Sequence, residues 1–161
     1  MPPSPLYLDR QQLLDAIALT PLTSIDLVIK DPSGRVLMGL RMNEPARGTW
    51  FVPGGRICKG ETLEAAFSRI SHAELGQAFS LGDATLKGAY THMYDSNFGR
   101  VPDLSTHYVV LAYELHVDET FTPAQDDQHS RFQWFGPSDP INGVHDYAKA
   151  YLDWPRADAQ D

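Results

Sequence analysis

Residues Trp50 to Gly76, WFVPGGRICKGETLEAAFSRISHAELG, decide the fold of this chain. The stretch opens with an apolar, strand-like run, and the pair Gly54-Gly55 then lets the backbone turn and approach a ligand closely. From Glu61 onward, apolar residues recur at the spacing of an amphipathic helix that ends at Gly76. The expected buried stripe of this helix consists of Leu63, Ala66, Phe67 and Ile70.

One carboxylate, Glu74, falls toward the apolar side of this helix and in its last turn, where the helix dipole disfavours an anion. A half-buried carboxylate at that position is costly unless a cation compensates it. The cation is either an arginine such as Arg69, which spacing alone favours, or a metal ion.

The spacing of Gly55, Glu61, Arg69, Glu74 and Gly76 resembles the Nudix box, G-x5-E-x7-R-E-U-x-E-E-x-G-U. The resemblance implies a loop–helix–loop over residues 54–76 that holds divalent metal against a diphosphate. It also implies an α+β Nudix fold, in which a mixed β-sheet is sandwiched between α-helices.

Three positions depart from that pattern. Ile70 and Ala73 stand where the box carries glutamates, and Gln77 stands at its closing apolar position. With the flanking segments WFVPGGR and ETLEAAF, this reduced box is similar to one Nudix subfamily, the GDP-mannose mannosyl hydrolases.

The remaining elements also favour an α+β fold with a mixed sheet between helices. Helices are expected at residues 7–19 and 144–153, and strands at residues 25–30, 35–41, 84–94, 106–117 and 131–135. A long acidic loop is expected over residues 118–130. Asp26 interrupts the first strand, which is typical of an edge or surface position.

The composition indicates one compact domain over residues 1–161, with 42% hydrophobic and 21% charged residues. A net charge of −8 argues against nucleic-acid or membrane partners. The single cysteine, Cys58, excludes an internal disulfide and favours a reducing compartment. Because no signal-like or membrane-length apolar run is found, we expect a cytoplasmic protein.

Arg41 and Arg56 flank the two sides of the glycine pair. Because guanidinium forks match phosphate oxygens, they are candidates to clamp a diphosphate. The resemblance implies further substrate contacts: Asp26 on the sugar side, Tyr108 as a donor to the leaving phosphate, and an N-terminal arm, residues 1–20, that cradles guanine through Tyr7, Leu8 and Leu13.

The resemblance also implies one Mg²⁺ per subunit. Gly54 would contribute its carbonyl, Glu74 its carboxylate and Gln128 its amide oxygen, an all-oxygen set that suits a hard ion. His129 would be the general base, since histidine titrates at about pH 6.5. The other histidines are assigned no role, although His92 and His107 border the expected cleft.

With the carboxylates missing at Ile70 and Ala73, the site is expected to hold fewer metals than an ordinary Nudix site. We therefore expect water to attack the anomeric carbon of GDP-mannose, with GDP-glucose as a second candidate, and to invert its configuration. Two alternatives stay open: a conventional diphosphatase that cuts the P–O bond, and a non-catalytic nucleotide-sugar sensor. The resemblance further implies a homodimer.

Overall fold

A seven-stranded mixed sheet forms the body of the molecule in the computed structural model, which describes residues 7–124 and 131–153. The strands are β1 (Leu22–Lys30), β2 (Val36–Leu40), β3 (Trp50–Phe51), β4 (Gly54–Arg56), β5 (Thr85–Tyr94), β6 (Thr106–His116) and β7 (Phe132–Phe135). The helices are α1 (Arg10–Leu19), α2 (Leu63–Leu75) and α3 (Asp146–Lys149), with a 3₁₀ turn, η1, at Leu81–Asp83.

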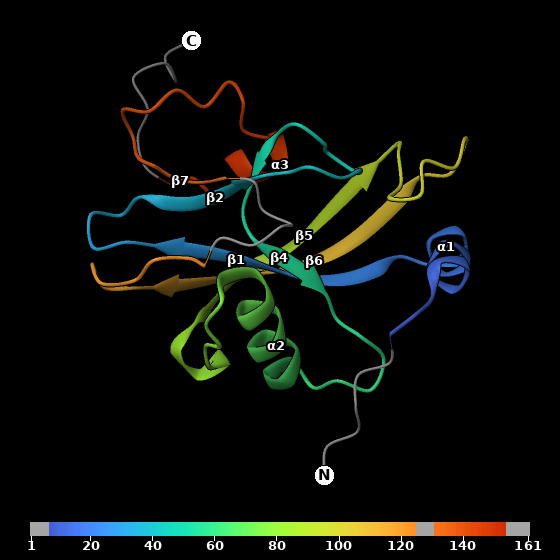
Figure 1. Cartoon of the computed structure of the whole chain (residues 1–161), viewed down its shortest axis with the longest axis horizontal. Coiled ribbons are helices and arrows are strands. Elements are labelled where there is room, and N and C mark those ends of the chain that lie inside the picture. Colours follow the sequence, from blue (N-terminus) through green and yellow to red (C-terminus); the bar gives the residue numbers. More distant parts are fainter. Residues whose placement is uncertain (1–6, 125–130, 154–161) are drawn as a thin grey trace.

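The strand order is β3-β2-β1-β6-β5, while β4 also pairs with β1 and β7 with β2. Strands β1 and β6 run parallel, and the other pairs are antiparallel. In Figure 1, α2 lies on one side of the sheet and α3 on the other, with α1 beside the ends of β1 and β6. This is the α+β sandwich that the sequence predicts.

Strand β1 is the centre of the core because apolar clusters cover both of its faces. Ile25, Leu27 and Ile29 belong to the cluster that contains α2, whereas Val28 belongs to the cluster that contains Ala148 of α3. Every residue of β1 except Thr23 is buried. A polar side chain on this strand is therefore held in place from all sides.

Helix α2 begins and ends where its capping residues predict. Thr62 is the N-cap and accepts a hydrogen bond from the Ala65 amide, and Gly76 ends the helix in the left-handed conformation, with φ of 78°. The prediction that Leu63 belongs to the buried stripe is wrong, because Leu63 is the first residue of the helix and is 38% exposed.

Other boundaries differ from the sequence prediction. The N-terminal helix begins at Arg10 rather than at residue 7, because Asp9 has extended backbone and forms a capping box with Gln12. The C-terminal helix is limited to the single turn of α3. No helix among the described residues is long and apolar enough to cross a membrane.

The glycine pair forms a strand, not the predicted turn. Gly54 and Gly55 lie opposite Asp26 and Ile25 in the antiparallel pairing of β4 with β1. A Cβ atom on Gly54 would lie 2.6 Å from the carbonyl oxygen of Ile25 and 2.7 Å from Oδ1 of Asp26. Glycine is therefore required here for close backbone approach, and not for an unusual φ.

Gly54→Ala should lower the free energy of unfolding by roughly 1–3 kcal/mol, because the added methyl group overlaps backbone that the core holds rigidly. Urea denaturation followed by circular dichroism measures this change. Gly82→Ala is the matched control, since its Cβ would meet nothing closer than Ser80 Oγ at 3.6 Å. Equal stability losses in the two variants would contradict the close-approach argument.

Candidate active site

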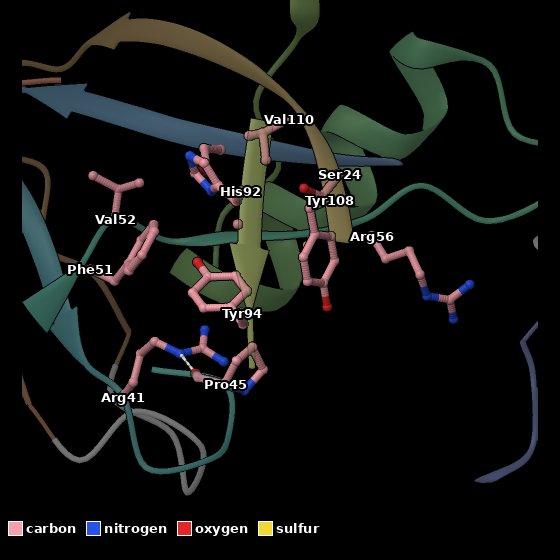
Figure 2. A pocket seen from close by; sticks show the side chains of 13 residues that line it. Ser24, Arg41, Pro45, Phe51, Val52, Arg56, His92, Tyr94, Tyr108 and Val110 are labelled. Atoms are coloured by element: carbon pink, nitrogen blue, oxygen red, sulfur yellow. Dashed lines mark hydrogen bonds between the residues drawn. The ribbon is translucent and has the colours of Figure 1, made fainter. Parts of the chain in front are cut away.

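Five of the predicted site residues, Gly54 among them, line one cavity, here called the central cavity (Figure 2). Asp26 comes from β1, Arg41 directly follows β2, Arg56 ends β4, and Tyr108 lies on β6. These segments are distant in sequence, and the pairing of β1 with both β4 and β6 brings them together.

Two further cavities adjoin the central one. The Glu74 cavity is lined by Gly54 and Glu74, and the Leu13 cavity is lined by Leu13 and Phe98 among others. Arg41 lines all three. Their volumes of about 110, 150 and 240 Å³ together reach the range of small-ligand sites, roughly 300–1,000 Å³. We refer to these three neighbouring cavities, which share Arg41, as the cleft.

Positive charge and a phenol face each other in the central cavity. In Figure 2 the Tyr108 ring lies between the side chains of Arg41 and Arg56. Arg41 Nε donates to the Pro45 carbonyl at 2.8 Å, which orients its guanidinium. Burial raises the pKa of Tyr108 above its ordinary value, against the opposing effect of the two arginines. Tyr108 therefore keeps its proton and is a hydrogen-bond donor beside two cations.

Asp26 is buried in the central strand of the sheet, with 8% exposure, so the edge position that its sequence context suggested is wrong. Burial raises its pKa from 3.8 to about 7, although the hydrogen bond from Tyr151 and the charge of Arg41 act in the opposite direction. The Tyr151 hydroxyl donates to Oδ2 of Asp26 at 2.6 Å. This carboxyl therefore titrates near neutral pH.

Two of the three predicted metal ligands, Gly54 and Glu74, lie in the part of the chain that the structure describes, and both line the Glu74 cavity. Gly54 and Glu74 line one cavity, so a carbonyl-bearing and a carboxylate-bearing residue adjoin the same space. No group of three or more His, Cys, Asp and Glu residues gathers anywhere in residues 7–124 and 131–153. The carbonyl of Gly54 and the carboxylate of Glu74 are oxygen donors, the kind of ligand that a hard ion such as Mg²⁺ prefers. Gln128 and His129 lie outside the described residues.

The two missing box carboxylates have different surroundings. Ile70 is buried, with 1% exposure, and packs beneath Gly55, where a Cβ would lie 3.1 Å from Ile70 Cγ1. Ala73 is exposed. Position 70 has become part of the core, since an apolar side chain fills the space under the short strand.

Arg69 is an internal support of the box. Its Nε and Nη2 donate to the carboxylate of Glu61, and Nη2 also donates to the Arg56 carbonyl at 2.8 Å. Glu61 in turn accepts from the Cys58 amide at 2.9 Å. These bonds fasten the segment between β4 and α2 to the helix.

Of the three side chains predicted to cradle guanine, Leu13 lines the Leu13 cavity, together with Ile17 of the same helix. Tyr7 is 64% exposed, with the Arg69 guanidinium 5.8 Å from its ring centre, and the half-buried Leu8 lines none of the three cavities. Phe98, which sequence reasoning passed over, lies opposite the arm in the Leu13 cavity.

Two aromatic residues of β5 belong to the site: His92, which was expected beside the cleft, and Tyr94, which sequence reasoning missed. His92 and Tyr94 line the central cavity, and their spacing of two along β5 was the available signal. His92 stacks on Tyr147 with ring centres 4.2 Å apart, and burial lowers its pKa to about 4, so it is neutral at neutral pH. His145, which was assigned no role, caps α3 through Nδ1 and contacts the rings of Phe51 and Tyr94.

A family model described as the NUDIX domain matches residues 20–154. The chain belongs to the Nudix family. It is 43% identical over 140 residues to the low-salt glycan biosynthesis protein Agl8 of Haloferax volcanii. The aligned residues cover 85% of this chain and 83% of that protein.

Solved structures agree with this Nudix assignment. The MutT NUDIX hydrolase from Burkholderia pseudomallei has a TM-score of 0.65 at 26% identity, over 82% of this chain and 95% of that one. The NUDIX domain of Shewanella oneidensis NrtR, solved with ADP ribose, has a TM-score of 0.54 at 19% identity, over 80% and 83% of the two chains. The second likeness concerns the fold alone. Nudix hydrolases act on nucleoside diphosphate compounds and generally use divalent metals such as Mg²⁺.

Asp26→Asn should gain stability relative to the natural chain as pH rises. Because the pKa of Asp26 is raised from 3.8 to about 7, the folded chain keeps a proton that the unfolded chain releases between those values. Its stability therefore falls across that window as pH rises. Asparagine does not titrate, so the difference in unfolding free energy should grow by up to about 4 kcal/mol from about pH 4 to about pH 7.5.

Urea titrations of both proteins in EDTA, at several pH values, measure this difference. The control is Asp15→Asn on the exposed face of α1, for which the difference should stay level. A level difference for Asp26→Asn would show that the carboxyl titrates as if it were solvated.

Proposed function

We propose that this Nudix protein hydrolyses a nucleoside diphosphate sugar, with GDP-mannose as the first substrate and GDP-glucose as the second, to GDP and free sugar. The observation that carries the proposal is the cleft in which Arg41, Arg56, Tyr108 and Asp26 converge. The cations suit a diphosphate, and the neutral phenol suits a departing phosphate oxygen. The similarity to a low-salt glycan biosynthesis protein supports a substrate that contains sugar.

The two flanking cavities favour one orientation of the bound substrate. The Leu13 cavity, with its apolar side chains from α1 and Phe98, suits the nucleoside. The Glu74 cavity suits Mg²⁺, held by Gly54 and Glu74 together with Gln128. Arg41 at the junction suits the diphosphate between them. Asp26, buried beside the arginines, suits the sugar.

In the proposed reaction, the oxygen of a water molecule bonds to the anomeric carbon, and the bond from that carbon to the β-phosphate oxygen breaks. His129 accepts the proton of the water. The electron pair leaves with GDP, whose growing charge Arg41, Arg56 and Tyr108 stabilise. The bound Mg²⁺ would supply further positive charge for the phosphates. A single displacement inverts the configuration at carbon.

Hydrolysis in ¹⁸O-labelled water tests where the attack takes place. We expect the label in the released sugar, as read by mass spectrometry, and the inverted anomer in an immediate proton NMR spectrum. Label in a phosphate product would instead identify a conventional Nudix diphosphatase. Absence of turnover across a panel of nucleotide sugars would leave a sensor that binds without catalysis.

His129→Gln should lower kcat by roughly 100- to 10,000-fold, because general-base catalysis contributes about that factor. The affinity for Mg²⁺ should be retained. The steady-state rate of sugar release measures the change, and His116→Gln, on the exposed end of β6, is the matched control. Near-natural turnover of the His129 variant would remove this residue from the mechanism.

Glu74→Gln should weaken Mg²⁺ binding, since a neutral amide replaces the carboxylate of the ligand set. Isothermal titration with MgCl₂ in the presence of GDP measures the affinity. Glu64→Gln, at the other end of α2 and exposed, provides the control. Identical titrations for the Glu74 variant and the natural chain would contradict its role as a ligand.

The homodimer stays a prediction, which light scattering tests directly.

A further inference from the structure

Tyr151 lies beyond α3, and 125 residues separate it from Asp26 in the sequence. Its side chain is fully buried, and its hydroxyl donates to Oδ2 of Asp26 at 2.6 Å. A tyrosine hydroxyl ordinarily titrates at about pH 10, so it carries a proton to donate at neutral pH. One oxygen of the Asp26 carboxyl is therefore occupied from the α3 side of the sheet.

Asp26 also lines the central cavity, and its other carboxyl oxygen lies beside Gly54. Oδ1 lies 2.7 Å from the place where a Cβ on Gly54 would stand, and Gly54 lines both the central and the Glu74 cavities. With Oδ2 bonded to Tyr151 and the backbone of Gly54 against Oδ1, the carboxyl plane has one orientation. The hydrogen bond thus selects which oxygen meets a ligand.

Tyr151 is itself held firmly in this position. Its ring meets that of Tyr90 edge-on, at 5.1 Å and 87°. Two residues further along, Asp153 accepts from Nζ of Lys30 at 2.9 and 3.0 Å and forms an ion pair with Lys87 at 3.2 Å. Lys30 and Asp26 are four residues apart on β1 and so share a face of the sheet. The segment from Tyr151 to Asp153 consequently follows β1, fastened at both ends.

We propose that Tyr151 is a positioning residue that orients the Asp26 carboxyl toward the sugar during the displacement. The inference rests on the proposed function. Because positive charge grows on the sugar carbon only as the leaving group departs, an oriented carboxyl oxygen stabilises the transition state more than the bound substrate. Loss of the hydroxyl should therefore lower kcat and leave KM nearly unchanged.

The test is a double-mutant cycle on the whole chain with Mg²⁺ and GDP-mannose, using Tyr151→Phe, Asp26→Asn and the double variant. A catalytic group displaced by about 1 Å costs on the order of 100-fold, so Tyr151→Phe should lower kcat by roughly 10- to 100-fold. The double variant should be no slower than Asp26→Asn alone, because Tyr151 acts through Asp26. Independent, multiplying effects would overturn the proposal, as would an unchanged kcat for Tyr151→Phe.

Tyr113→Phe is the matched control, since Tyr113 is a buried tyrosine of β6 that packs against Phe67 on the opposite face of the sheet. It should leave kcat and KM unchanged. The affinity for GDP, measured by titration calorimetry, separates positioning from general damage: Tyr151→Phe should retain it. Joint loss of GDP affinity and kcat would overturn the positioning role, whereas a natural chain that releases no sugar would overturn the proposed function instead.

Discussion

The contact between the backbone of Gly54 and the carboxyl of Asp26 is the constraint on which the site depends. It lets the short strand β4 pair with the central strand β1, and this pairing sets Arg56 beside Tyr108 on the neighbouring strand. A side chain at residue 54 would separate the strands by the width of a methyl group. Gly54 itself lines both the central and the Glu74 cavities.

The Nudix box of this chain keeps the residues that hold its loop in place but has lost two of the carboxylates that would bind metal. Glu61 and Arg69 are retained, and they fasten the segment after β4 to α2. Ile70 has joined the core, and Ala73 has no charge to contribute. The loop therefore keeps its shape while its negative charge is lowered, which leaves Glu74 as the carboxylate of the box that lines the cleft.

Much of the fold could be predicted from local signals. Gly76 and the helical spacing before it predicted α2 and its end correctly. Arg41 and Arg56 were candidates because they flank the glycine pair, whereas Tyr108 followed from the family resemblance, and all three line one cavity. Pairing of Gly54 with β1 could not be predicted, because glycine has no strand preference and its partner lies far away in the sequence. The bond from Tyr151 to Asp26 was hidden for the same reason, since no periodicity connects residues 125 positions apart.

The two ends of the cleft differ in structure: one is formed by the buried core and the other by a surface helix and connecting segments. The end that contains Asp26 is formed by the buried strand β1 and by the segment after α3, so a substitution there also disturbs the core. The Leu13 cavity is lined by residues of α1 and of two connections, residues 41–49 and 95–105, which are joined by a hydrogen bond from Ser96 to Glu44. Under the proposed function, substitutions in these surface segments would change which base is recognised, whereas a substitution beside Asp26 would also disturb the core.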